Sequence, residues 1–145
     1  MMDLKQALNV QVANWSVLYT KLHNYHWYVK GSQFFTLHEK FEELYDEAAE
    51  VVDEIAERLL AIGGKPVASL KEYLETTTLQ EAGNETTAKE MVAALIADYK
   101  KIKDELVELA EAADEQNDFV TNDLAIGLIE KIDTHVWMLS AYLED

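Results

Sequence analysis

The sequence predicts an all-α protein, a four-helix bundle in which one long connection carries a short helix of its own. Apolar residues make up 49% of the 145 residues, enough to bury a sizeable core in a single domain over residues 1–145. The chain has only five Gly and one Pro, whereas an all-β fold with many turns needs more. Four long segments repeat apolar residues at steps of three and four, the spacing of one helix face.

The first two long segments predict helices over residues 3–29 and 36–62. In the first, the apolar positions run in helical steps as far as Val29, and Gly31 then separates the two segments. The second opens with Thr36 and Glu39, whose spacing is that of a capping box and marks a helix start.

The third and fourth segments predict two further helices of similar length. Thr87 and Glu90 form another capping-box pattern, and the apolar face that follows extends to Ala113. The fourth helix is expected to begin within residues 118–123 and to end near Leu143. At about 25 residues each, the four helices would be roughly 40 Å long, so they match in length and can pack side by side.

The connection between the second and third helices is long, over about residues 65–85. Residues 69–75 within it have the pattern of a short helix. Because the other connections are short, the long one must cross along the bundle, which is the ferritin-like connectivity.

Composition excludes several classes of function. Twenty-eight acidic residues face 12 basic ones, for a net charge of −16, which disfavours binding to nucleic acid or to an anionic membrane and favours cations. The absence of Cys excludes disulfides, cysteine zinc sites and thiol catalysis. No apolar run is long enough for a membrane span or resembles a signal peptide, so the expected location is the cytoplasm.

Two side-chain pairs have the spacing of metal ligands. His38 and Glu42 are four residues apart on one predicted helix face, as are Asp53 and Glu57. His26, near the end of the preceding helix, can converge with His38 across the hairpin. No His follows a Glu by three residues, which argues against a di-iron site inside the bundle. The four histidines are His23, His26, His38 and His135.

One chain cannot bring both pairs to a single metal centre. Asp53 lies fifteen residues after His38, roughly 22 Å along a helix, whereas ligands of one metal lie within about 5 Å of each other. A single centre would therefore need a second copy related by a two-fold axis. Mixed imidazole and carboxylate ligands suit iron. The alternative is a packed histidine and an ordinary solvated acidic face.

Several motifs together carry a family resemblance that covers nearly the whole chain. They are His26-Trp27, Gly31, Phe34, Leu37-His38, Tyr45, residues 53–66 and residues 133–138. With these motifs the chain resembles the Dps family of mini-ferritins. The resemblance implies a hollow shell of twelve subunits that acts as a ferroxidase. Such a shell oxidises Fe(II), preferably with hydrogen peroxide rather than O2, and stores Fe(III) mineral.

The resemblance also implies a ligand set for the dinuclear iron centre. His26 and His38 would come from one subunit, and Asp53 and Glu57 from its two-fold partner. Glu42 falls where some members have an additional acidic ligand.

Further acidic and aromatic residues suggest secondary roles. Trp27 could accept stray oxidising equivalents, or could simply pack. Asp118, Asp123 and Glu130 would line iron-uptake pores by the same resemblance, or would cap a helix. Glu43, Asp46, Glu47 and Glu50 share a helix face, where they would nucleate mineral if they face a cavity and would be ordinary solvated acids otherwise.

Two alternative functions stay open at this stage. Family members that bind DNA usually carry a Lys- and Arg-rich tail, whereas residues 1–20 hold only Lys5 and the last two residues are acidic. A DNA-compacting protein that protects DNA under stress is therefore disfavoured by charge. An inert helical interaction module would show neither saturable Fe(II) binding nor faster iron oxidation.

Overall fold

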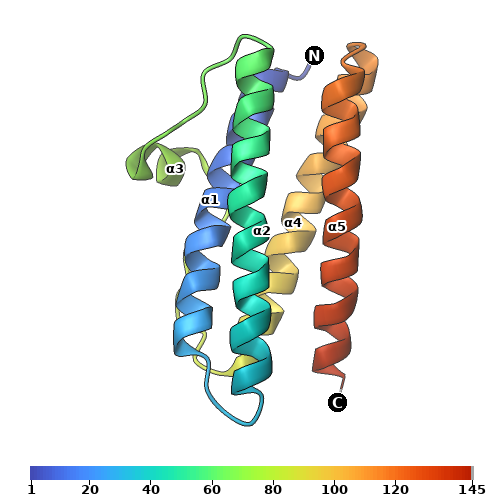
Figure 1. Cartoon of the computed structure of the whole chain (residues 1–145). Coiled ribbons are helices and arrows are strands. Elements are labelled where there is room, and N and C mark those ends of the chain that lie inside the picture. The colour runs from blue at the N-terminus through green and yellow to red at the C-terminus, as the bar shows by residue number, and fades with distance from the viewer. Residues whose placement is uncertain (145) are drawn as a thin grey trace.

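The computed structural model describes residues 1–144 and contains five helices. They are α1 (Leu4–Tyr28), α2 (Phe34–Ala61), α3 (Leu70–Thr76), α4 (Ala88–Glu115) and α5 (Phe119–Leu143). Figure 1 shows the four long helices side by side, with the short α3 projecting beside α1 from the crossover between α2 and α4. The predicted all-α class and the ferritin-like four-helix bundle are confirmed.

Most predicted helix starts coincide with observed caps. The Asp3 carboxylate accepts hydrogen bonds from the backbone N–H groups of Lys5 and Gln6 and so caps α1. Ser69 caps α3. Thr87 and Glu90 form the predicted capping box of α4, with both reciprocal hydrogen bonds present.

The predicted start of α2 at Thr36 is wrong. The helix begins at Phe34, and its N-cap residue Gln33 makes no side-chain capping hydrogen bond. Gly31, with a φ of 106°, reverses the chain, and Phe34 N–H then donates to Gly31 O at 3.1 Å. These backbone contacts start the helix one turn early, so the capping-box residues lie inside it.

The apolar faces of the four long helices meet in one core. Trp15 on α1, Phe41 on α2, Tyr99 on α4 and Ile132 on α5 are all fully buried. Burying a large apolar side chain contributes about 1.5–3 kcal/mol, so these faces hold the helices together. Within residues 1–144, no helix is both long and apolar enough to cross a membrane.

The crossover is tied to α1 and α4 by one asparagine. Asn14 Oδ1 accepts hydrogen bonds from the Thr78 backbone N–H at 2.8 Å and from the Thr77 hydroxyl at 2.6 Å. Asn14 Nδ2 and the Thr78 hydroxyl in turn donate to the two carboxylate oxygens of Glu105 on α4. These bonds hold the long connection against the bundle and position α3 beside α1.

Candidate metal centre

The α1–α2 hairpin brings the two predicted histidine ligands into contact. His26 lies in the last turn of α1 and His38 in the second turn of α2. Their rings are stacked, with centroids 3.7 Å apart and planes 13° apart. The predicted convergence of His26 and His38 is therefore observed.

Reciprocal hydrogen bonds determine which ring nitrogens can bind a metal. His26 Nδ1 lies 2.6 Å from the His38 carbonyl oxygen, and His38 Nδ1 lies 2.7 Å from the His26 carbonyl oxygen. A carbonyl oxygen only accepts, so each Nδ1 carries the hydrogen and donates it. In the neutral imidazoles both Nε2 atoms then keep a free lone pair, the arrangement typical of metal-binding histidines.

Aromatic side chains hold the two imidazoles from both sides. Phe34 stacks on His38, with ring centroids 5.0 Å apart. Tyr45 meets the edge of His26 at 5.3 Å and is itself stacked on His23 at 3.8 Å. The apolar walls limit rotation of the imidazoles and keep them oriented before any metal binds.

Glu42 is the one predicted acidic ligand beside these histidines. Its Oε1 lies 3.9 Å from His26 Nε2, and its side chain is 52% exposed. A flexible carboxylate at that distance can close on a cation bound at Nε2. Burial and the charges of Glu42 and Asp46 raise the pKa of Tyr45, so the neighbouring phenol stays protonated.

The second predicted pair of ligands lies elsewhere on α2. Asp53 and Glu57 are both exposed, and neither makes an ion pair or side-chain hydrogen bond within residues 1–144. The helix between His38 and Asp53 is unbroken, so Asp53 lies roughly 22 Å along α2 from His38. In the described part of the chain, no three His, Asp or Glu residues are grouped so that they could hold a metal ion.

The three acids proposed to line a pore lie in different environments. Asp118 is the N-cap of α5, accepting from Thr121, and pairs with Arg58 at 2.9 Å. The structure thus assigns Asp118 the capping role considered above. Burial opposes ionisation, but the Thr121 hydrogen bonds and the Arg58 charge lower the pKa of Asp118 overall. Asp123 and Glu130 are exposed on α5.

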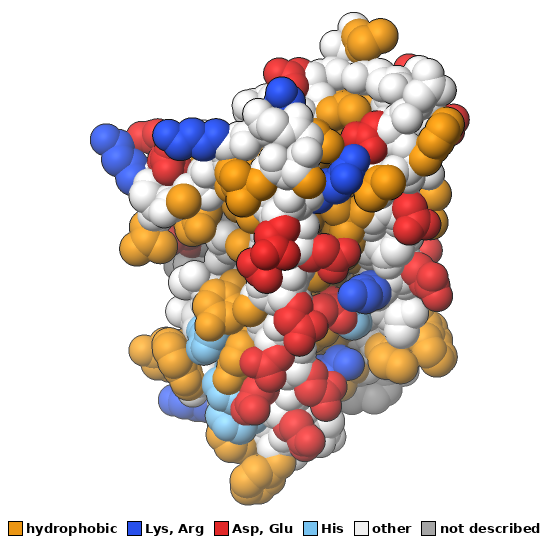
Figure 2. Space-filling model, turned by 45° about the horizontal axis from the view of Figure 1, so that its top comes forward, with side chains coloured by type: hydrophobic (Ala, Val, Ile, Leu, Met, Phe, Trp, Pro, Cys, Tyr) orange, Lys and Arg blue, Asp and Glu red, His pale blue; other side chains and the backbone are white. Residues whose placement is uncertain are grey.

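The acidic face of α2 includes one lysine pair among the described residues, in which Lys40 Nζ lies 3.6 Å from Glu43 Oε2. Figure 2 shows acidic side chains in a band on one side of the molecule, with histidine side chains beside it. Glu43, Asp46 and Glu50 are exposed on α2, whereas Glu47 differs from the other three. Its carboxylate turns toward α5 and lies 2.8 Å from His135 Nε2. The exposed acids of α2 are Glu39, Glu42, Glu43, Asp46, Glu50, Asp53, Glu54 and Glu57.

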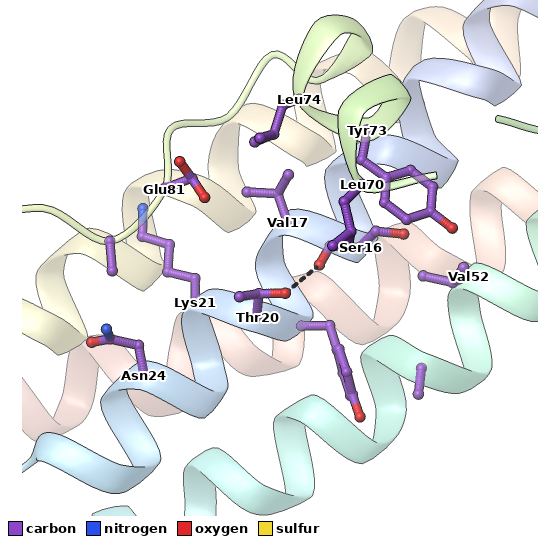
Figure 3. A pocket seen from close by; sticks show the side chains of 13 residues that line it. Ser16, Val17, Thr20, Lys21, Asn24, Val52, Leu70, Tyr73, Leu74 and Glu81 are labelled. Atoms are coloured by element: carbon purple, nitrogen blue, oxygen red, sulfur yellow. Dashed lines mark hydrogen bonds between the residues drawn. The ribbon is translucent and has the colours of Figure 1, made fainter. Parts of the chain in front are cut away.

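An apolar groove of about 730 Å³ lies between α1, α2 and α3 (Figure 3). Val17 of α1 and Leu70 and Leu74 of α3 turn into this space, and Val52 of α2 forms the opposite wall. Leu70 is 77% exposed and Leu74 is 51% exposed, although both are large apolar side chains. Exposed apolar surface of this kind marks an interaction site.

Sequence reasoning missed two features of the centre. The reciprocal bonds between His26 and His38 depend on the tight α1–α2 turn, for which only Gly31 gives a signal in the sequence. The groove is formed by residues of three helices, so no local residue spacing predicts it.

Trp27, proposed as a radical trap, is 65% exposed and makes a ring contact with His23 at 5.1 Å.

Comparison with known proteins gives consistent matches over the whole chain. A family profile described as a ferritin-like domain matches residues 5–145. The chain is 58% identical over 138 residues to DNA protection during starvation protein 2 of Bacillus anthracis, covering 95% of this chain and 94% of that protein. It is 54% identical over 141 residues to general stress protein 20U of Bacillus subtilis, covering 97% of each. The structure superposes on the crystal structure of Dps from Staphylococcus aureus with a TM-score of 0.96 and 50% identity, covering 99% of this chain and 96% of that one.

Proposed function

The chain belongs to the Dps group of the ferritin-like family, and from this premise we propose that it oxidises Fe(II) and stores Fe(III) mineral. Its place of action in this proposal is the cytoplasm, inside a hollow shell of twelve copies. One observation carries the proposal. His26 and His38 are held as a pair with both Nε2 lone pairs free, and Glu42 is the only acid in contact with that pair within residues 1–144.

We propose that a second copy of the chain completes each centre. Asp53 and Glu57 are two unpaired carboxylates within residues 1–144, and they lie roughly 22 Å and 28 Å along α2 from His38, too far to reach the same metal. An antiparallel copy related by a two-fold axis would bring its own carboxylates to these histidines and would receive the same in return. Each pair of copies would then hold two identical centres.

The apolar groove supports the docking of that second copy. Val52, which lines the groove, directly precedes Asp53 in α2. Tyr19 lines the groove from α1 and makes a ring contact with His23 at 4.6 Å. The groove therefore lies between the carboxylate pair and the histidine cluster, so one copy seated there would border both.

Each group of ligands has a distinct chemical task in the proposed reaction. The His26 and His38 imidazoles would bind Fe(II) through Nε2, and their Nδ1 hydrogen bonds fix the tautomer and the orientation of each ring. The carboxylates of Asp53, Glu57 and Glu42 supply the negative charge that favours the Fe(III) product. Fe(II) is the substrate here: two Fe(II), one hydrogen peroxide and two protons give two Fe(III) and two water molecules. Because two adjacent ions supply both electrons, no hydroxyl radical need be released.

Acids away from the centre would assist uptake and storage. Asp123 and Glu130 project from α5 into solvent, and copies around a three-fold axis would repeat them as a ring that concentrates cations. Asp118 would stabilise the base of that ring as a cap paired with Arg58. Glu43, Asp46 and Glu50 would bind Fe(III) as mineral nucleates, whereas Glu47 is engaged by His135.

An anaerobic titration tests this function. We expect saturable Fe(II) binding, and on addition of peroxide we expect one peroxide consumed for every two Fe(II) oxidised, on protein whose solution mass shows a closed oligomer. A variant carrying His26→Ala and His38→Ala provides the control and should lose both binding and rapid oxidation. A monomeric mass, or iron oxidation no faster than in buffer, would contradict the proposal.

DNA protection is the second candidate, because relatives are named for it. A net charge of −16 opposes contact with phosphates, so any association would need a bridging divalent cation. Gel retardation of DNA at low salt, with and without Mg²⁺, separates the two cases. Retardation without Mg²⁺ would favour direct DNA binding by the shell.

A further inference from the structure

A group of four side chains, two fully buried and two partly buried, lies between the four long helices, apart from the His26–His38 pair. Each long helix contributes one member: Trp15 from α1, Glu47 from α2, Tyr99 from α4 and His135 from α5. Trp15 Nε1, the Tyr99 hydroxyl and His135 Nδ1 are buried with no hydrogen-bond partner among residues 1–144. Buried polar atoms are nearly always paired, so three unpaired atoms in one group call for an explanation.

The hydrogen bond between Glu47 and His135 determines what His135 can do. His135 Nε2 lies 2.8 Å from Glu47 Oε1, and a carboxylate oxygen only accepts, so Nε2 carries the hydrogen. In the neutral imidazole, Nδ1 is then a buried proton acceptor without a donor. The Tyr99 ring centroid lies 5.3 Å from that of His135, and its hydroxyl is a buried donor without an acceptor. The unpaired atoms of these two residues are thus chemically complementary.

Burial and neighbouring charges keep the Tyr99 phenol protonated in the resting protein. Burial, and then the Glu47 and Asp98 carboxylates, raise the pKa of Tyr99 well above its ordinary value. A buried phenol cannot lose an electron alone, because the cation left behind is strongly acidic and would remain in an apolar core. Oxidation of Tyr99 therefore requires a base at hand, and His135 Nδ1 is the one that its ring contact provides.

We propose that Tyr99 is a buried one-electron donor, with His135 as the acceptor of its proton and Glu47 as the residue that holds the imidazole in place. The oxidant is a hydroxyl radical, formed when a single Fe(II) meets peroxide. Tyr99 gives one electron to that radical, which takes a solvent proton and leaves as water, while the phenol proton moves to His135 Nδ1. One further Fe(II) then reduces the tyrosyl radical and becomes Fe(III), and the proton returns to the phenol oxygen. This role rests on the proposed iron oxidation, which supplies the oxidant.

Two groups of aromatic rings lie between the candidate metal centre and Tyr99. From His26 the ring contacts run to Tyr45 at 5.3 Å and on to Tyr19 at 5.9 Å. Trp15 precedes Tyr19 by one helical turn on α1, and its ring lies 6.3 Å from Tyr99. An oxidising equivalent that arises at the centre would have to cross from Tyr19 to Trp15, a step of one helical turn without a described ring contact, to reach the core. Trp27, in contrast, is exposed to solvent and would hold such an equivalent at the surface.

Freeze-quench EPR of the full-length assembled protein tests this proposal. The first set of samples receives limiting Fe(II) and then peroxide. The second contains no iron and receives ruthenium(III) generated by light, which removes one electron directly. We expect a tyrosyl radical in both sets, most of which is lost in Tyr99→Phe. The matched control is Tyr25→Phe, because Tyr25 is equally buried but makes its only described ring contact with Phe41, and a carboxylate, Glu85, lies beside its hydroxyl in place of an imidazole.

The role of His135 needs a readout that packing alone would not change. High-field EPR reports whether the tyrosyl oxygen accepts a hydrogen bond. We expect a hydrogen-bonded radical in the wild-type protein and loss of that signature in His135→Leu. An unchanged tyrosyl signal in Tyr99→Phe in the iron-free samples would overturn the proposal, as would the absence of any tyrosyl radical there. If the protein fails to oxidise iron, the proposed function is refuted. The iron-free samples would still show whether Tyr99 is the electron donor.

Discussion

Two inactive variants of this chain should restore each other's activity when they assemble together. His38→Ala removes the histidine side of each proposed centre and keeps Asp53 and Glu57, whereas Asp53→Ala removes the carboxylate side and keeps His26 and His38. In a mixed pair, one of the two centres receives both damaged sides and the other receives both intact sides. Each variant alone should lose rapid iron oxidation, because none of its centres is complete.

The arrangement of the ligands gives the size of the recovery. Equal amounts of the two chains, paired at random, give about half mixed pairs, and each mixed pair has one intact centre of two. About a quarter of wild-type activity should therefore return if the centres act independently. Asp53 is exposed and unpaired within residues 1–144, so its loss should leave folding intact.

The assay is stopped-flow oxidation of Fe(II) by peroxide after the chains are dissociated and refolded together. A matched control mixes His38→Ala with His26→Ala, which damage the same side, and it should recover nothing. Mass spectrometry verifies that mixed oligomers have formed. If verified mixtures of the first kind stay as inactive as the control, the two-fold shared centre is wrong.

The remaining predictions concern uptake and stability. Asp123→Asn combined with Glu130→Gln should slow iron oxidation at low ionic strength but not at high salt, where the electrostatic attraction of these carboxylates for Fe(II) is screened. Equal rates for wild type and variant at low salt would contradict the pore assignment. Thr87→Ala removes the α4 capping box and should lower the free energy of unfolding by about 1 kcal/mol in urea titration. Gly63→Ala places a side chain at a φ of 85° and should destabilise by about 1–2 kcal/mol, measured in the same way; no change would mean that the turn relaxes without strain. Because its folded pKa is lowered, Asp118 stabilises the fold above about pH 4 and loses that contribution as the pH falls further, so Asp118→Asn should flatten the acid limb of a stability–pH curve.

The helices could be predicted from the sequence because their information is local. Apolar steps of three and four, and the caps at Asp3, Ser69 and Thr87, each lie within one turn of the helix that they start. The failure at Thr36 has the opposite cause. A capping-box pattern is present there, but the turn at Gly31 forms backbone hydrogen bonds first and leaves Thr36 inside the helix.

The candidate site was predictable in composition but not in its supporting contacts. Spacing and resemblance selected His26, His38 and Glu42, which the structure brings together. Contacts between residues far apart in the sequence could not be foreseen. Glu47 seemed equivalent to its acidic neighbours on α2, yet its position opposite His135 removes it from the solvated face.

The reciprocal hydrogen bonds between His26 and His38 bear on how the proposed iron store would be reused. Each ring is oriented by the backbone of the other, so the geometry of the pair is made by the polypeptide and does not depend on a bound ion. Many metal sites collapse when emptied, because the ion itself holds the ligands in place. Here the ligands on the histidine side would survive removal of iron unchanged. In the proposed function, a shell with such centres would be filled, emptied and filled again without refolding, which is what a reusable store requires.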